Sequence, residues 1–210
     1  MLAVASVLVA GCSRAVEGHP VAAAGAGGPD DSQCTKVDVP LTTVPAAPGA
    51  PDDSEPTMRV PQPEGWDRIT KMDSEMIRFT MGNRSLGVTG FAASAVVTIE
   101  SHPGELDASS FFDEARDALA SSFGTVDLDY TDGTICGLPA QTIHYVLPKG
   151  GALKQEASAT AVMVVVFTGR KTYGVVLTIQ SPVPDDADYQ HDAELITTGF
   201  QVFAPDSGHR

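Results

Sequence analysis

Residues 157–168 read ASATAVMVVVFT, and this hydrophobic stretch is the strongest fold signal in the chain. Its length is too short to span a bilayer, which takes about 20 helical residues. The β-branched segment Val162–Phe167 is followed closely by the polar residues 169–172, a pattern typical of a buried strand that ends in a turn. We therefore expect a central strand covered on both faces, with residues 173–180 returning as its hairpin partner.

Alternating apolar and polar residues predict further strands around this hairpin. These strands are expected at 76–81, 95–100, 125–131 and 141–147. Asp132-Gly133 is expected to turn the chain after the third of them.

Two segments have the features of helices. The first has Asp107 or Ser109 as its expected cap and an apolar stripe at helical spacing formed by Phe112, Ala115, Leu119 and Ser122. The second is expected to begin near Pro184-Asp185 and to stop at Gly199. Together with the strands, they predict an α+β fold in which an antiparallel β-sheet packs with helices in one domain.

The N-terminal residues 1–11, MLAVASVLVAG, predict a signal segment that runs into Cys12. Val9-Ala10-Gly11-Cys12 has the spacing of a lipobox, in which the cysteine receives diacylglycerol and further acyl chains such as palmitate. The alternative is an ordinary hydrophobic region with an incidental cysteine. Signal peptides begin with Lys or Arg, and none precedes Cys12, so we expect the true start to lie upstream of Met1.

Composition divides the remainder of the chain. Residues 12–33 are rich in Ala, Gly and Pro and are expected to form a disordered tether. The folded domain is expected over 34–205, with a Pro-rich arm at 34–66 that wraps the domain without regular structure, and 206–210 form a tail. A length of 210 residues with this tether favours one domain, which we expect to be a monomer.

Two cysteines remain after Cys12, namely Cys34 and Cys136. An even number of cysteines in an exported protein predicts one disulfide. The alternative is a pair of free buried thiols. The formal net charge of −14 argues against nucleic acid as a partner, because phosphates would be repelled.

No pattern of catalytic or metal-binding residues stands out. The chain has no Gly-x-Ser-x-Gly elbow, and His144 is expected to be a hydrogen-bonded strand residue. Residues 127–133 lack the alternation of a calcium loop, and the acidic residues of 185–192 are accounted for in part by helix capping. We therefore expect no enzyme activity, catalytic residue, metal or cofactor.

A hydrophobic cavity between sheet and helix is the remaining candidate site. We expect Trp66, Phe91, Phe112 and Val164 to line it, and such a cavity would accept an apolar ligand. The alternative is that Trp66 is a core residue that anchors the arm.

Several segments, taken in order, resemble one family. They are the lipobox, Cys34 before a Pro-rich arm, Glu55-Pro56-Thr57, Pro61-Gln62-Pro63-Glu64-Gly65-Trp66, Gly90-Phe91, Gly137-Leu138-Pro139-Ala140 and Gly199-Phe200. Their order resembles the LpqN/LpqT-type lipoproteins of mycobacteria. The resemblance implies a PsbP-like α/β sandwich without established enzymatic activity.

Two functions follow as expectations from these residues and from the resemblance. The first is a non-enzymatic binding or adaptor protein of the cell envelope, which contacts envelope or host proteins. The alternative is a carrier of envelope lipid or glycolipid chains, and a hydrolase is a distant third. In each case we expect the protein on the extracytoplasmic face of the cell membrane, held there by its lipid anchor, with a part of it secreted.

Overall fold

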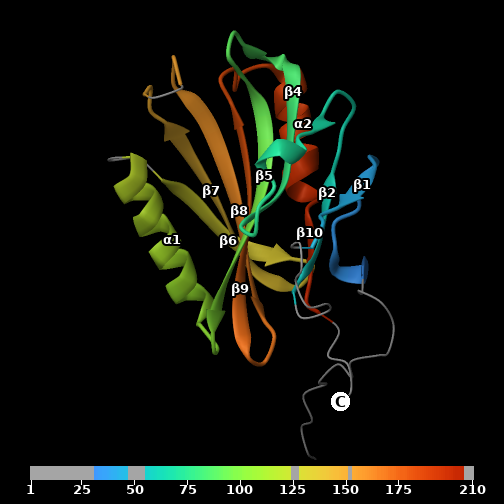
Figure 1. The fold of residues 1–210 in the computed structure, drawn as a ribbon, viewed down its shortest axis with the longest axis vertical. Coiled ribbons are helices and arrows are strands. Elements are labelled where there is room, and N and C mark those ends of the chain that lie inside the picture. Colours follow the sequence, from blue (N-terminus) through green and yellow to red (C-terminus); the bar gives the residue numbers. More distant parts are fainter. Residues whose placement is uncertain (1–30, 47–54, 124–127, 151–152, 206–210) are drawn as a thin grey trace, which may run out of the picture.

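The computed structural model describes residues 31–46, 55–123, 128–150 and 153–205. Its main element is an antiparallel sheet in the order β3-β4-β5-β9-β8-β7-β6 (Figure 1). The bounds of its strands are Asp67–Arg68 for β3, Ile77–Val88 for β4, Phe91–Pro103 for β5, Asp129–Ile135 for β6, Leu138–Leu147 for β7, Ala157–Phe167 for β8 and Lys171–Ser181 for β9. The α+β fold predicted from the sequence is confirmed.

The hydrophobic stretch that predicted a central strand forms β8. This strand pairs with β7 on one side and with β9 on the other, and the side chains of Ala161–Val166 are all buried. Both faces of β8 are therefore covered. One face contributes Val162, Val164 and Val166 to the larger hydrophobic core.

The two helices lie on opposite faces of the sheet. Helix α1 (Ala108–Phe123) lies over β7 and β8, where Phe112 belongs to the smaller core cluster (Figure 1). Helix α2 (Ala187–Thr198) contributes Tyr189 and Ile196 to the larger cluster on the other face. Among the described residues, no helix has the length and apolar character needed to cross a membrane.

A second, three-stranded sheet packs beside α2, in the order β1-β2-β10. It consists of β1 (Leu41–Thr43), β2 (Thr57–Pro61) and β10 (Gln201–Phe203). The prediction that the arm at 34–66 has no regular structure is therefore wrong. The arm gains β structure because β10, which follows α2, pairs with β2. A short 3-10 helix, η1 (Asp31–Gln33), precedes this sheet.

The turn predicted at Asp132-Gly133 is also displaced. Both residues lie inside β6, and the chain turns at Cys136-Gly137. These two residues have φ angles of 49° and 80°, which a type I′ hairpin turn requires. Cys136 forms a disulfide with Cys34, which joins the start of the arm to the tip of the β6–β7 hairpin.

Candidate functional site

Helix α1 is positioned by its cap and by aromatic contacts at both ends. The Asp107 carboxylate accepts hydrogen bonds from the backbone N–H groups of Ser109 and Ser110 and from the Ser109 hydroxyl. The Ser109 hydroxyl contributes most to holding the pKa of this carboxyl below its usual range. At the other end of the helix, the Phe123 ring stacks on the Tyr145 ring with 6.0 Å between their centroids. The contacts at its two ends together determine the direction in which α1 crosses the sheet.

Gly174 allows the first turn of α1 to approach the sheet closely. A Cβ atom built on Gly174 would lie only 2.1 Å from Cζ of Phe111. The ring of Phe111 therefore occupies the space that a side chain on β9 would fill. This contact places the N-terminal part of α1 at the border between β8 and β9.

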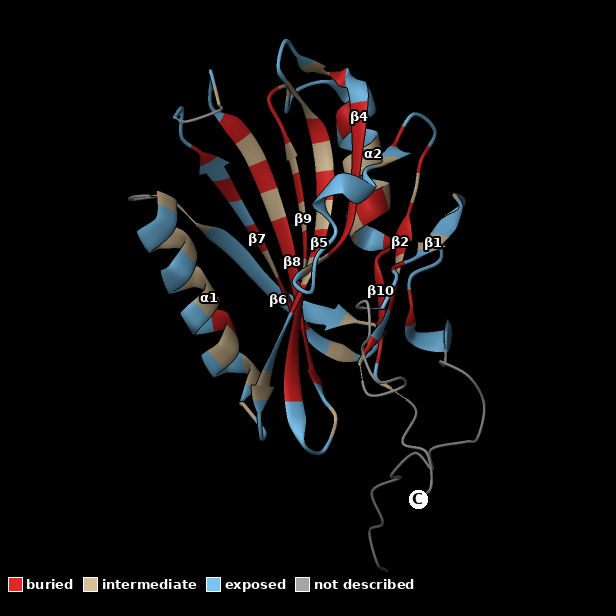
Figure 2. Ribbon diagram, viewed as in Figure 1, coloured by how far each residue is buried: buried red, intermediate tan, exposed pale blue. Residues whose placement is uncertain are grey.

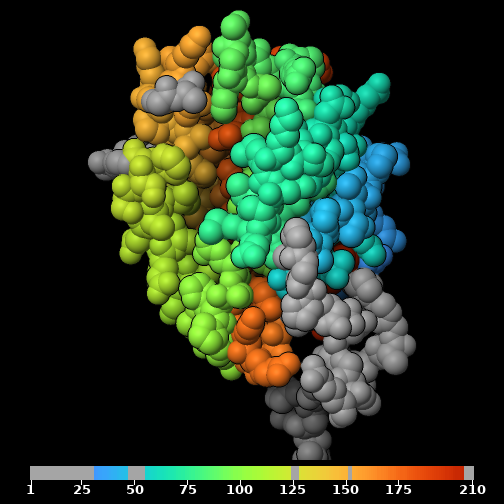
Figure 3. Space-filling model, in the orientation of Figure 1, coloured from blue at the N-terminus to red at the C-terminus, as the bar shows by residue number. Residues whose placement is uncertain are grey.

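Because α1 packs on β7 and β8, the part of the same sheet face that β5 and β9 form is only partly covered, and we call this hollow the trough. The residues on that face of β5 and β9 are half-buried, and we call them the trough floor: Ser94, Val96, Thr98, Val176, Thr178 and Gln180. On the opposite face of the same strands, Ala95, Val97, Val175, Leu177 and Ile179 are 0% exposed. Figure 3 shows a hollow between yellow-green α1 and the teal chain near residue 70, with orange and brown atoms of the central strands at its base.

The trough floor carries no charged side chain. Its polar groups largely bond to one another or to the wall: the Gln180 amide donates to Oγ of Ser94 at 3.1 Å, and Tyr145 hydrogen-bonds Thr178. Burial raises the pKa of Tyr145, although the Thr178 hydrogen bond opposes this shift. Tyr145 therefore stays neutral at physiological pH. The floor combines two valines with four uncharged polar side chains, so the surface suits a neutral ligand that has both apolar and hydrogen-bonding parts.

Exposed apolar side chains gather on the segment that borders the trough opposite α1. This rim follows β3 and includes η2 (Thr70–Met72), and its Ile69, Met72 and Met76 are 37%, 48% and 52% exposed. A Cβ atom built on Gly82 would lie 3.3 Å from Cδ1 of Ile69. Ile69 therefore packs over the face of β4 that borders the trough. Methionine side chains adapt their shape to apolar partners.

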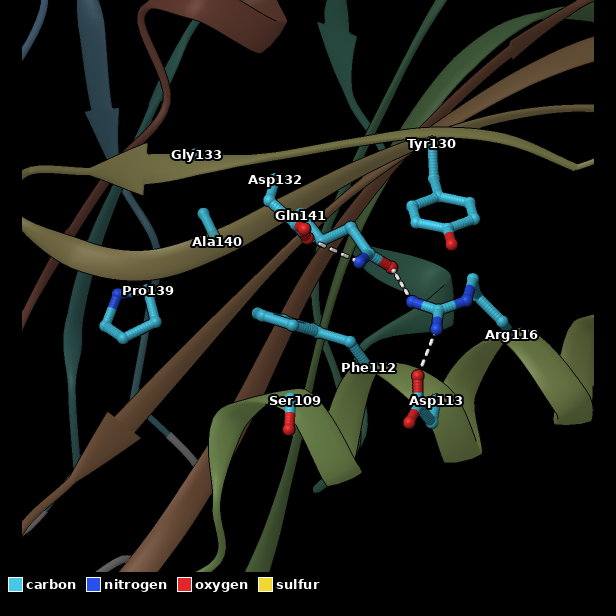
Figure 4. A pocket seen from close by; sticks show the side chains of 10 residues that line it. All are labelled: Ser109, Phe112, Asp113, Arg116, Tyr130, Asp132, Gly133, Pro139, Ala140 and Gln141. Carbon is cyan, nitrogen blue, oxygen red and sulfur yellow. Dashed lines mark hydrogen bonds and ion pairs between the residues drawn. The ribbon is translucent and has the colours of Figure 1, made fainter.

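A second concave surface lies on the other flank of α1. It is a cleft of about 300 Å³ between α1 and the β6–β7 hairpin (Figure 4). Nη1 of Arg116 donates to Oε1 of Gln141 at 2.6 Å, and the guanidinium lies 4.2 Å from the centroid of the Tyr130 ring. Arg116 also forms an ion pair with Asp113. Nε2 of Gln141 donates to Asp132 at 2.7 Å, so the buried amide is satisfied on both sides.

Among the described residues that line the two surfaces, no hydroxyl group is paired with a histidine, and the Ser109 hydroxyl at the cleft donates to Asp107 as part of the helix cap. His144 is exposed on β7, and its Nδ1 lies 2.9 Å from Oγ1 of Thr160, as expected for a hydrogen-bonded strand residue. Within the described residues, no group of three or more His, Cys, Asp or Glu side chains is placed to hold a metal ion. The cleft polar groups bind one another, and the trough is neutral, so both surfaces are suited to binding.

The structure does not bring together the four residues predicted to line one cavity. Trp66 and Val164 lie in the larger core, where the indole Nε1 donates to Asp192 at 2.7 Å. Phe91 and Phe112 belong to the smaller cluster on the other face. Trp66 therefore has the alternative role, that of a core anchor. Cys12 lies outside the described residues.

The sequence reasoning missed the floor and rim of the trough. Val96 and Thr178 occur in strands that were expected, but alternation alone does not tell which face a helix leaves uncovered. The signal available in the sequence is Met72, an apolar residue between Lys71 and Asp73 that lies outside every expected strand and helix.

Comparison with known proteins assigns the family. The Lpp-LpqN family, described as probable lipoprotein LpqN, matches residues 38–203. This chain belongs to the Lpp-LpqN family. No curated protein sequence matches it. A structural relative is LpqN of Mycobacterium tuberculosis, a protein involved in cell envelope biogenesis, with a TM-score of 0.61. The two chains are 14% identical, and the match covers 78% of this chain and 91% of LpqN. The likeness shows that the two proteins share this fold despite their large sequence difference.

Proposed function

We propose that this Lpp-LpqN family member is a non-enzymatic binding protein of the cell envelope that holds a neutral apolar chain, such as the acyl chain of a lipid or glycolipid, in the trough. The half-buried, uncharged floor around Val96 and Thr178 carries this proposal. The opposite face of the same strands is fully buried in the larger core, whereas this face is half-buried and open to a ligand.

The charge of the protein narrows the class of ligand. With a formal net charge of −14, the chain repels anionic headgroups at long range. An uncharged acyl chain avoids this repulsion and gains free energy from burial, at about 0.8 kcal/mol for each buried methylene. The flexible side chains of Met72 and Met76 on the rim would pack against acyl chains of different shape.

Filling the trough tests this proposal. Val96→Trp adds a large side chain to the floor and is expected to weaken binding of a neutral pyrene-labelled monoacylglycerol by about tenfold, or about 1.4 kcal/mol. Fluorescence titration measures the affinity. Val146→Trp is the matched control, since Val146 is 47% exposed on β7 and points to the opposite face from Gln141 and Ile143.

Two results would count against the trough. Equal loss of affinity in both tryptophan variants would place the lipid elsewhere, and absence of binding by the wild-type protein would reject the acyl ligand. Val164→Trp is unsuitable here, because Val164 is 0% exposed in the core and the change would act on folding.

Anchoring at Cys12 is a separate part of the proposed function. Cys12→Ala removes the thiol that would receive diacylglycerol, so we expect the protein to move from the membrane fraction to the soluble fraction and to lose metabolic labelling with palmitate. Cys34→Ser, which alters a cysteine of the disulfide, is the control and should keep the label. Unchanged membrane retention of Cys12→Ala would contradict the anchor.

A further inference from the structure

The β6 strand forms an open edge of the large sheet. It pairs with β7 over seven consecutive residue pairs, and among the described strands none pairs with its other side. All residues from Asp129 to Thr134 are exposed. Proteins usually protect such an edge with charged side chains, proline or a bulge. β6 has no proline or bulge, and its charged side chains are the two aspartates Asp129 and Asp132, which repel an acidic strand but not a basic one.

The hairpin turn determines which backbone groups face the open edge. In a two-residue type I′ hairpin, the residues that flank the turn, here Ile135 and Leu138, form a hydrogen-bonded pair. Hydrogen-bonded pairs then recur at every second residue. Tyr130, Asp132 and Thr134 are therefore the residues whose N–H and C=O groups point away from β7.

The side chains of these outward residues meet the cleft beside α1. Tyr130 and Asp132 line it together with Asp113, and a strand added along β6 would place its own alternate side chains next to them. Arg116 lies in the same cleft and already pairs with Asp113, so the group that favours a cationic side chain at this position is the exposed carboxylate of Asp132, which accepts from the neutral Gln141 amide (Figure 4). Asp129 adds a further negative charge on the same strand.

We propose that β6 is a strand-addition site for an extended basic segment of a partner protein, with Lys or Arg at alternate positions and one of these side chains in the cleft. Backbone hydrogen bonds to the edge supply affinity, and the Asp132 carboxylate selects the side chain. A second copy of this chain is a poor occupant, because pairing two β6 edges would bring the aspartates of both strands close together. This site is independent of the trough, and it would serve an adaptor function.

Amide hydrogen exchange with a defined peptide tests the geometry. The probe is an extended peptide that alternates Lys with Thr, and the matched control peptide has Glu in place of Lys. The Lys peptide is expected to slow exchange at the amides of Tyr130, Asp132 and Thr134, whose N–H groups are free. The amides of Thr131 and Gly133 already bond to β7 and should change little.

Two pairs of variants separate backbone pairing from charge. Thr134→Pro removes an outward N–H and is expected to weaken peptide binding at least tenfold, whereas Thr134→Val keeps that N–H and should bind as the wild type does. Asp132→Asn keeps the oxygen that accepts from Gln141 but loses the charge, so it should bind several-fold more weakly. Asp129→Asn, with its side chain on the other face, should lose less.

Several outcomes would overturn the proposal. These are equal binding of the Lys and Glu peptides, protection spread over strands other than β6, and unchanged affinity in Thr134→Pro. Dimerisation of the wild-type protein through β6, detected by sedimentation and abolished by Thr134→Pro, would assign the edge to a second copy instead.

Discussion

Gly174→Val is expected to lower the free energy of unfolding by about 1–3 kcal/mol, the usual cost of overpacking a core. The new Cβ would overlap the Phe111 ring, and Gly174 is buried in β9 between β5 and β8, so the strand cannot move aside. The ring and the first turn of α1 must therefore rise from the sheet. Urea denaturation measures the change, and the trough should widen at the same time.

A compensating change tests the cause. Phe111→Ala removes the ring that meets the new side chain, so Gly174→Val combined with Phe111→Ala should be less destabilised than the sum of the two single variants. Additive losses would contradict steric overlap as the mechanism. Phe112→Ala combined with Gly174→Val is the control pair, because the contact at Gly174 involves Phe111.

Loss of the disulfide is expected to have the largest effect on stability. Cys34 and Cys136 are separated by 102 residues, and cross-linking a loop of about this length restricts the unfolded chain by up to about 4.7 kcal/mol. Cys34→Ser combined with Cys136→Ser should therefore lower the unfolding free energy by about 2–5 kcal/mol. For a domain of this size, the melting temperature should fall by roughly 4–20 °C.

The disulfide prediction has a direct control. A reducing agent should lower the melting temperature of the wild-type protein to that of the double variant and should leave the double variant unchanged. A wild-type protein that keeps its melting temperature after complete reduction, verified by thiol titration, would contradict the stabilising role of this bond.

The strongest sequence patterns predicted the fold at the level of its elements. The run at 157–168 gave the central strand β8 because burial on both faces requires an unbroken apolar segment. The Phe112 stripe gave α1, and Asp107 caps it as expected. The α+β class followed because antiparallel strands and two amphipathic segments must bury their apolar faces against one another.

The candidate site could not be predicted in the same way, because it depends on contacts between distant segments. The contact between Phe111 and Gly174 determines which part of the sheet α1 covers, and these two residues are 63 positions apart in the sequence. The turn at Cys136-Gly137 was missed because Asp132-Gly133 is the commoner turn pair, and the disulfide holds Cys136 at the hairpin tip. Trp66 and Val164 were placed with Phe91 and Phe112 because alternation does not distinguish two buried faces.

The position of the disulfide also determines how the domain would respond to mechanical load. If the protein is anchored at Cys12 as proposed, tension would enter the folded domain near Cys34 and pass through a covalent bond into the β6–β7 hairpin of the large sheet. The short strand β1, which follows Cys34 in the chain, is therefore shielded from that force. After reduction the same pull would act on β1 first and peel it from β2, so the redox state of the envelope would decide whether the anchored domain resists stretching or unravels from its N-terminal end.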